Sequence, residues 1–365
     1  MNRIAGSPFA LLLAIAALAA CQGEVSVSGG QADGGSGSGS GGASSSSSGS
    51  SSGATPASSG GTPCSGTGGG SSAGATAPTV LAHVPASPTV LAVDCSNLYV
   101  APYEIGVVTA VSLADGSQRT LNPVSANSLA MDATRIYSVS PGGGDEAQGL
   151  VLACPKSGCT PSYTTLATGQ TNVWGVAVDG QNVYWTNQGA PGAVMKAPLA
   201  GGAPTTLVGA GSAASIAAAG GSVIYSGYVT TGSALLMSVP IAGGPAQVLF
   251  TPDNGNSVES LAVDASNAYF VTTDGIVGQV PLGGGTVVTL ATNQGNGILG
   301  MTVDSGRLYW AANSNGTIVS IPIGGGATTT LASGQPGPVG VAVDSTNVYW
   351  SNMGDNTVMK IALTQ

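Results

Sequence analysis

Apolar and polar positions recur along this chain in one arrangement. An apolar run ends at an aspartate, two or three polar residues follow, and a second apolar run begins near a tyrosine. The clearest copy is Val341 to Trp350, VAVDSTNVYW. Six earlier copies begin at Leu91, Leu129, Val176, Ile216, Leu261 and Met301, and the one at Ile216 is degenerate. Two apolar runs joined by a tight polar turn are typical of a β-hairpin.

The spacing of these hairpins predicts the architecture. Their tyrosines, Tyr99, Tyr137, Tyr184, Tyr225, Tyr269, Tyr309 and Tyr349, lie 38 to 47 residues apart, a period typical of propellers with one sheet per repeat. The third repeat divides into four strands: Val173 to Asp179, Asn182 to Asn187, Ala193 to Leu199 and Pro204 to Val208. We therefore predict an all-β fold, a seven-bladed β-propeller of four-stranded antiparallel blades.

The two ends of the propeller predict how the ring closes. After the last hairpin the chain supplies one more strand, Thr357 to Leu363, so the seventh blade lacks an outer strand. The segment Pro78 to Ala82 precedes the first blade and matches the outer strand Thr329 to Ala332. We predict that Thr79 to Ala82 pairs with Asn356 to Leu363. Near the axis the blades crowd, so one face of each inner strand should carry small residues.

The N-terminal segment is typical of an exported protein. Residues 1–20 combine Arg3 with the apolar run Phe9 to Ala20, which predicts a signal peptide rather than a membrane span. The junction Leu18-Ala19-Ala20-Cys21 resembles a bacterial lipobox, which implies acylation of Cys21 and anchoring to the cell envelope. Gln22 in place of aspartate then favours an outer membrane, if the cell has one. The alternative is a plain signal peptide with an incidental cysteine.

Residues 21–77 are read as the lipidated cysteine followed by a tether, and residues 78–365 as the propeller. The tether is nearly all Gly, Ser, Ala and Thr, so it cannot bury enough apolar surface to fold. A flexible Gly/Ser chain of this length reaches roughly 40 Å.

Charge restricts the partners. Only 6% of the residues are charged, and the net charge is −9 with seven Lys and Arg in total. Nucleic acids and anionic membrane surfaces need clustered basic residues, so neither is expected as a partner beyond the lipid anchor. Six acids sit in the repeated turn, at Asp94, Asp132, Asp179, Asp264, Asp304 and Asp344, where we expect them to accept backbone N–H groups. We expect a monomer.

The cysteines predict one disulfide and leave a second open. Cys154 and Cys159 flank the turn of a hairpin as CPKSGC, so we expect them to be bonded in an exported protein; two free thiols are the alternative. Cys64 and Cys95 would pair by elimination, although Cys64 lies in the tether.

Residues that commonly carry catalysis are scarce. His83 is the single histidine, so a site built from several histidines is excluded. There is no GxSxG motif, and no glycine-rich segment resembles a phosphate loop.

One end of the propeller, which we call the loop face, gathers the starts of first strands and the ends of second strands. Aligned repeats place Thr89, Asn127, Trp174, Ala214, Glu259, Leu299 and Val339 at equivalent positions around the axis there. Glu259 is the lone acid of this ring. Neighbouring loops add Asn187, Gln188, Asn313, Asn352 and Asp355, a polar rim suited to a protein or a sugar. The plainer interpretation is a set of solvated loops with Trp174 packed on a neighbour.

The second strands carry family resemblances. Tyr184-Trp185-Thr186-Asn187 and Tyr349-Trp350-Ser351-Asn352 resemble the YWTD repeats of receptor propellers, with Asn replacing Asp and seven predicted blades where that family has six. This resemblance implies protein binding across one face. The chain is also similar to bacterial extracytoplasmic propellers that include streptogramin lyase and gluconolactonase-like hydrolases. Those activities imply, respectively, a well-placed histidine and a metal held by Glu, Asn and Asp.

Three functions are compatible with these observations. The first is a lipid-anchored, non-catalytic binding or scaffold module for an envelope protein or glycan, with no cofactor. The second is a metal-assisted lactonase or lyase, in which Glu259 would cooperate with Asn127 or loop asparagines around Ca²⁺. The third is a purely structural component of the envelope.

Overall fold

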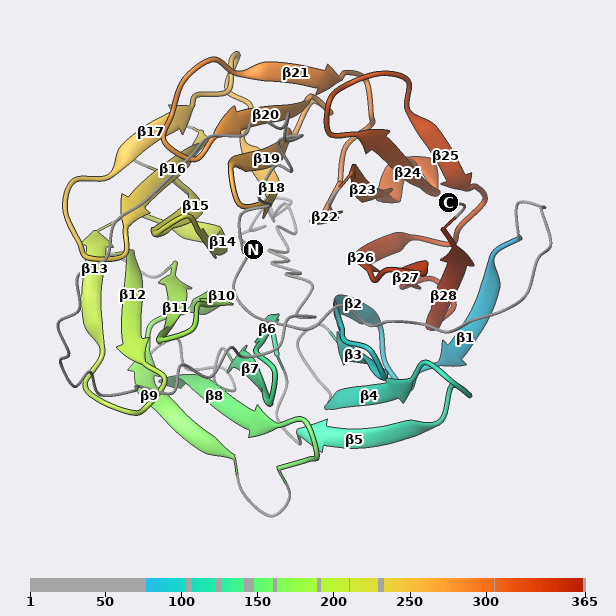
Figure 1. The fold of residues 1–365 in the computed structure, drawn as a ribbon, viewed down its shortest axis with the longest axis horizontal. Helices are drawn as coiled ribbons and strands as arrows, with labels where there is room; N and C mark the ends of the chain where they lie inside the picture. Colours follow the sequence, from blue (N-terminus) through green and yellow to red (C-terminus); the bar gives the residue numbers. More distant parts are fainter. Residues whose placement is uncertain are drawn as a thin grey trace, which may run out of the picture.

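The computed structural model describes residues 77–102, 107–122, 126–140, 148–159, 163–188, 192–209, 211–228, 233–304 and 306–363. These residues form seven four-stranded antiparallel sheets around one axis, so the predicted seven-bladed β-propeller is confirmed (Figure 1). The predictions for the signal peptide, Cys21 and the tether up to residue 76 lie outside the described residues. Within the described part of the chain, no helix is long and apolar enough to cross a membrane.

The strands follow one another from the axis outwards in each blade. Blade one contains β2 (Pro88–Val93), β3 (Asn97–Pro102), β4 (Val108–Ser112) and β5 (Gln118–Asn122), and blade two contains β6 (Ser128–Met131), β7 (Arg135–Ser140), β8 (Gly149–Pro155) and β9 (Thr164–Gln170). Blade three contains β10 (Val173–Val178), β11 (Asn182–Asn187), β12 (Ala193–Pro198) and β13 (Thr205–Gly209), and blade four contains β14 (Ala213–Ala219), β15 (Ser222–Tyr228), β16 (Ala234–Pro240) and β17 (Gln247–Phe250).

The later blades repeat this order. Blade five contains β18 (Val258–Val263), β19 (Asn267–Thr272), β20 (Val277–Pro281) and β21 (Val288–Ala291), and blade six contains β22 (Gly300–Val303), β23 (Arg307–Ala312), β24 (Thr317–Pro322) and β25 (Thr329–Ala332). Blade seven contains β26 (Pro338–Val343), β27 (Asn347–Asn352) and β28 (Thr357–Ala362), and its fourth strand is β1 (Thr79–His83).

Ring closure is confirmed as well. Strand β1 lies beside β28 although the two are at opposite ends of the propeller (Figure 1), with Thr79 opposite Lys360 and His83 opposite Thr357. The Val84 N–H extends the contact by donating to the Asn356 carbonyl at 2.9 Å. Blade seven therefore has no unpaired outer edge on β28, which would otherwise invite pairing with another chain.

The repeated aspartates close the first hairpin of their blades. In the turn of blade seven, Asp344 Oδ1 accepts the N–H groups of Thr346 and Asn347, each at 2.7 Å. Asp344 Oδ2 accepts the Tyr349 hydroxyl at 2.8 Å. The same tyrosine bond, from five residues further along the chain, is made to Asp94, Asp132, Asp179, Asp264 and Asp304. We call this arrangement the Asp–Tyr clamp, and it confirms a structural role for these acids.

Blade four lacks the clamp. Gly220 stands five residues before Tyr225, where the other blades have aspartate, and its φ of +57° lets the turn close without a side chain. Burial raises the pKa of Tyr225 to about 12. Burial also raises the pKa of Tyr349, and the neighbouring Asp344 carboxylate raises it further.

Small residues face the axis, as expected. A Cβ placed on Gly300 would lie 2.1 Å from the Val339 carbonyl oxygen of the next blade, so only glycine fits there. At the equivalent place in blade four, the Ser215 hydroxyl donates to the Glu259 carbonyl oxygen at 3.2 Å. The first strands are thus joined by close backbone approach or by a single hydroxyl.

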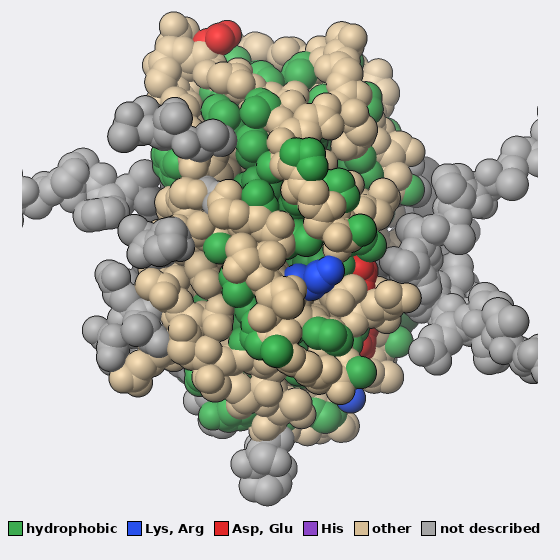
Figure 2. All heavy atoms as spheres, turned by 90° about the vertical axis from the view of Figure 1, so that its left-hand side faces the viewer, with side chains coloured by type: hydrophobic (Ala, Val, Ile, Leu, Met, Phe, Trp, Pro, Cys, Tyr) green, Lys and Arg blue, Asp and Glu red, His purple; other side chains and the backbone are tan. Residues whose placement is uncertain are grey.

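Uncharged side chains make up most of the outer wall. Figure 2 shows the side of the ring around β13 and β17, where charged side chains are isolated among polar and hydrophobic ones. Val80, Val248 and Val288 are about half exposed on outer strands. This surface agrees with the low content of charged residues in the sequence.

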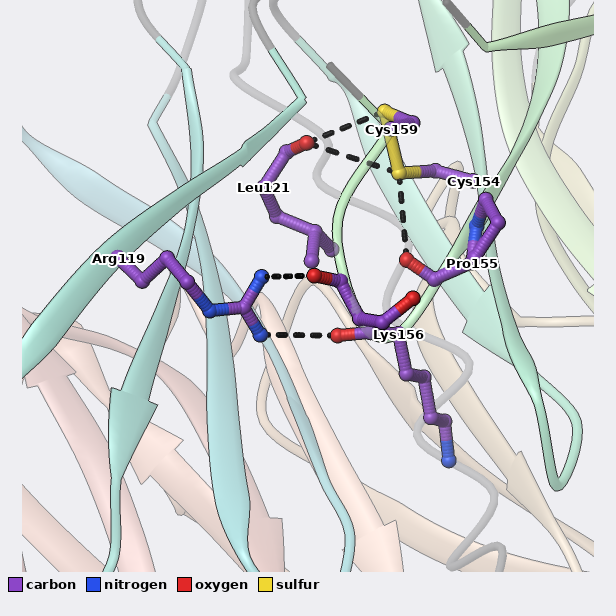
Figure 3. Close-up of a disulfide and its surroundings, with 7 residues drawn as sticks. Arg119, Leu121, Cys154, Pro155, Lys156 and Cys159 are labelled. Atoms are coloured by element: carbon purple, nitrogen blue, oxygen red, sulfur yellow. Dashed lines mark hydrogen bonds between the residues drawn. A yellow bond between two sulfur atoms is a disulfide. The ribbon is translucent and has the colours of Figure 1, made fainter.

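Blades one and two are connected through the CPKSGC turn. Cys154 and Cys159 form the predicted disulfide, with their Cα atoms 5.2 Å apart. The Arg119 guanidinium of β5 donates to the carbonyls of Lys156 and Ser157 at 2.9 and 2.8 Å (Figure 3). Lys156 forms an ion pair with Asp94 at 3.1 Å. Cys95 is also disulfide-bonded, and its pairing with Cys64 stays a prediction because Cys64 lies outside the described residues.

Candidate functional site

At five of the seven equivalent positions on the loop face the strand ladder is interrupted by a β-bulge. In blade five, Val258 lies opposite Thr272 and Ser260 lies opposite Val271, so Glu259 is an extra residue without a partner on β19. Similar irregularities occur at the start of β2, β10, β14 and β26, at Thr89, Trp174, Ala214 and Val339. A bulge changes the direction of a side chain relative to the ladder. This is the local reason why Glu259 is not part of the regular alternation of β18.

Glu259 is held between two neighbouring blades. Its side chain is 7% exposed, and its Oε2 accepts the Ile298 N–H from the segment preceding β22 at 3.2 Å. Burial raises the pKa of Glu259, and the N–H groups of Ile298 and Gly297 offset part of that effect. Among the described residues the recorded ion pair is Lys156 with Asp94, and Glu259 takes part in none. Within the described chain, the groups that the buried Glu259 carboxyl group accepts from are therefore backbone N–H groups.

This carboxyl group lines a cavity on the loop face. The cavity has a volume of about 690 Å³ and is formed by loops of blades five, six and seven. Its lining residues are Glu259, Thr273, Asn296, Gly297, Leu299, Asn313, Gly337, Val339, Met353 and Gly354. We call it the loop-face cavity. Its volume lies within the range of sites for small molecules or single side chains of a partner.

Asn313 is the second predicted residue that lines the cavity. Its amide donates to the Pro338 carbonyl at 3.2 Å. Gly297 and Gly337 flank it with φ of +70° and +67°, and a Cβ added at either would lie within 4 Å of the Asn313 side chain. The two glycines thus keep the space around Asn313 open.

Asn187 and Asn352 were predicted as rim residues, and the structure places them beneath the rim. They are 9% and 1% exposed. Asn352 Nδ2 and Trp350 Nε1 both donate to Gln335 Oε1, at 3.2 and 2.8 Å. In blade three, Asn187 and Trp185 make the same two bonds to Gln170 Oε1. Each glutamine thus orients a tryptophan and an asparagine together. The Oδ1 atoms of the two asparagines have no hydrogen-bond partner within the described chain.

The remaining predicted residues are spread around the ring. Asn127, in blade two, is 5% exposed and its amide donates to the Val173 carbonyl at 3.3 Å. Trp174 is partly buried, and its buried Nε1 has no partner among the described residues. Gln188 donates its N–H to the Asn172 carbonyl at 3.0 Å. Asp355 is exposed and accepts the Thr357 hydroxyl at 2.7 Å.

The metal-assisted alternative gains limited geometric support. Glu259 and one of the loop asparagines, Asn313, line one cavity, whereas the alternative partner Asn127 is hydrogen-bonded in blade two. In the part of the chain that the structure describes, no three His, Cys, Asp or Glu side chains form a group able to hold a metal. A calcium site here would have to use amide and backbone oxygens beside the one carboxylate.

Several residues that line the cavity, or that hold the buried asparagines beneath the rim, were not predicted from the sequence. Met353, Asn296 and Thr273 line the cavity, and Gln170 and Gln335 fix the two buried asparagines. The glutamines carry a signal in the sequence, since each follows a glycine and lies four residues before the ring position of its blade. No such signal exists for the cavity residues, because their proximity depends on how three separate loops fold.

Comparison with known proteins supports the fold. No protein-family model matches this sequence, and no curated protein shows a significant match. Virginiamycin B lyase from Staphylococcus aureus is similar with a TM-score of 0.63 and 11% identity, covering 76% of this chain and 95% of that chain. A streptogramin B lyase has the same TM-score and identity, covering 79% and 97%. The computationally designed Ika8 protein has a TM-score of 0.56 and 15% identity, covering 78% and 99%. At these identities the likeness shows that the chain is a β-propeller and leaves its activity open.

Proposed function

We propose that this protein is a lipid-anchored, extracytoplasmic propeller that binds an envelope protein or glycan through its loop face without catalysing a reaction. The observation that carries the proposal is the loop-face cavity, where a buried carboxyl group and an amide meet an apolar wall. Concave sites that combine a few polar groups with apolar side chains are typical of binding sites. The Cys154–Cys159 disulfide supports export, because structural disulfides persist in oxidising compartments.

Site-specific crosslinking tests the binding site. A photo-reactive amino acid replaces Met353 at the cavity in one variant and Val248 on the outer wall in a matched control. Both variants are produced as full chains in a cell with a bacterial envelope. We expect a defined adduct from position 353 that is absent from position 248, identified as protein or glycan by mass spectrometry. Adducts that are the same at both positions, or none at position 353, would contradict binding at the loop face.

Lipidation is tested separately because Cys21 lies outside the described residues. Metabolic labelling with palmitate should mark the full chain and leave Cys21→Ala unlabelled, since only the thiol can carry the diacylglycerol. Equal labelling of the two chains would reject the anchor and leave the binding proposal unaffected.

The second candidate function is the calcium-assisted lactonase or lyase. It is favoured by the shared position of Glu259 and Asn313 on one cavity. Calcium binding should then raise the melting temperature of the parent protein and not that of Glu259→Gln, with Mg²⁺ as the comparison ion. A melting temperature that is independent of calcium would remove this candidate.

A further inference from the structure

The buried carboxyl group of Glu259 is the feature of the loop-face cavity that limits what can bind there. A carboxylate removed from water is costly unless a cation or several hydrogen bonds compensate it. Glu259 receives one backbone hydrogen bond of 3.2 Å from Ile298, with a further contribution from the Gly297 N–H. No Lys or Arg occurs among the described residues that line the cavity.

The lysine and arginine side chains of the described residues lie away from the loop-face cavity. Arg119 and Lys156 are held in the contact between blades one and two. Lys196 donates to the Ile241 carbonyl at 2.8 Å, and Arg307 donates to Ser320 at 3.0 Å. Arg135 lines a separate pocket between blades two and three, and Lys360 lies on β28. Within the described part of the chain, therefore, no Lys or Arg offsets the charge of Glu259.

The wall beside Glu259 matches an aliphatic stem. Met353, which is partly buried, and Leu299, which is 6% exposed, line the same cavity, whereas Val339 is fully buried in the core. Lysine and arginine bury their methylene groups along apolar surfaces while their charged ends reach a polar partner. A neutral sugar would bury hydroxyl groups against this wall and would leave the carboxylate without a cation.

The cavity is also lined by uncharged side chains that can form hydrogen bonds. Asn296 and Asn313 are on loops of blade six, and Thr273 is on a loop of blade five. Asparagine amides and threonine hydroxyls can donate to and accept from peptide groups. The buried Glu259 carboxyl group, the apolar side chains and these more exposed polar side chains therefore line one cavity.

Deepening the binding function proposed above, on which this step rests, we infer that the loop-face cavity receives a cationic side chain of a partner protein, an ammonium or guanidinium group on an aliphatic stem, with Glu259 as its counter-ion. The charged hydrogen bond formed in the cavity is stronger than one between neutral groups. The raised pKa of Glu259 in the free protein is consistent with a carboxyl group that lacks such a counter-ion.

Small model compounds test this inference on the full chain in detergent. The probes are Nα-acetyl-lysine methylamide and Nα-acetyl-arginine methylamide, and Nα-acetyl-norleucine methylamide is the neutral control of similar shape. Binding is measured by calorimetry or by NMR titration. We expect the parent protein to bind a cationic probe at least about tenfold more tightly than norleucine, because Glu259 is 7% exposed and water screens its charge less than at the surface.

Three variants connect the preference to the carboxyl group. Glu259→Gln keeps the size of the side chain and an acceptor for Ile298, and should abolish the preference for a cation. Glu259→Asp keeps the charge with a shorter reach, and should retain the preference at lower affinity. Asp253→Asn neutralises an exposed carboxylate in the loop before β18, and should bind as the parent does. Near-ultraviolet circular dichroism verifies that each variant is folded.

The outcomes separate this inference from the proposed function. Equal binding of cationic and neutral probes, or an unchanged preference in Glu259→Gln, would overturn the role of Glu259 as counter-ion. Binding of a neutral oligosaccharide such as chitotetraose, equally tight in parent and Glu259→Gln, would overturn it in favour of a glycan. In either case a specific adduct at position 353 would leave the proposed binding function standing.

Discussion

The Asp–Tyr clamp can be measured against a blade that lacks it. Tyr349→Phe removes a hydroxyl group that donates to Asp344 at 2.8 Å and accepts a longer bond from the Asn347 amide at 3.2 Å. Tyr225→Phe removes the same group in blade four, where Gly220 stands in place of the aspartate. Both tyrosines are 1% exposed, so the two substitutions change the buried ring to the same extent.

The expected loss follows from the type of hydrogen bond. A bond to a charged acceptor contributes about 1.5 to 3 kcal/mol, and a bond between neutral groups about 1 kcal/mol. Asp344 keeps its bonds to Thr346 and Asn347 and is partly exposed, so water can reach the vacated oxygen. We therefore expect the lower end, about 1.5 kcal/mol for Tyr349→Phe, and less than about 0.5 kcal/mol for Tyr225→Phe.

Thermal and urea unfolding at pH 7 provide the measurement. For a domain of this size, a loss of 1.5 kcal/mol lowers the melting temperature by about 3 °C. A double-mutant cycle that combines Tyr349→Phe with Asp344→Asn should assign most of the lost unfolding free energy to the interaction between the two side chains. Equal losses in Tyr349→Phe and Tyr225→Phe would refute the reasoning, since the carboxylate would then contribute nothing beyond burial of the ring.

Three other substitutions or conditions have clear expectations. Gly300→Ala should cost about 3 kcal/mol of unfolding free energy because its Cβ meets a backbone oxygen, whereas Gly324→Ala, with open space around it, should be neutral; equal stabilities would refute the crowding at the axis. A chain beginning at Ala86 should melt earlier and aggregate more than one beginning at residue 77, because it lacks β1; identical melting curves would reject the role of ring closure. Burial raises the pKa of Asp94, but the hydrogen bonds it accepts and the Lys156 charge outweigh burial and lower it below 3.8. The ionised Asp94 should therefore stabilise the fold fully above its pKa in the unfolded chain, and this stabilisation should be lost as pH falls through its lower pKa in the folded protein. Asp94→Asn should flatten the dependence of the unfolding free energy on pH below 4, and an unchanged slope would contradict this.

The regular features of the fold could be predicted because the residues that form each hairpin lie close together within one repeat. The Asp344 turn and Tyr349 are five residues apart, and the same spacing in five other blades predicted the hairpins. Ring closure was predictable for a similar reason, since Thr79 to Ala82 repeats the pattern of an outer strand at a place where no blade needs one. Both signals are local in sequence.

The candidate site was predicted in part because its residues come from separate blades. The alignment of repeats placed Glu259 at the start of an inner strand, and in the structure it lies in the bulge at the start of β18. Asn187 and Asn352 were predicted as exposed loop residues, but the amide of each donates to a glutamine seventeen residues earlier and is buried beneath the rim. The contribution of Met353 depends on the packing of blade seven against blade six, which a pattern within one repeat does not report.

The pairing of β1 with β28 also determines how the protein responds to force. Any pull transmitted along the chain that precedes residue 77, while the loop face is held by a partner, reaches β1 before any other strand. The first event under load would be the removal of β1 from blade seven, which opens the ring and leaves the cavity wall formed by Val339 and Met353 with less support. The strength of the pairing between β1 and β28, rather than the global stability of the propeller, would then set the tension that the ring can withstand.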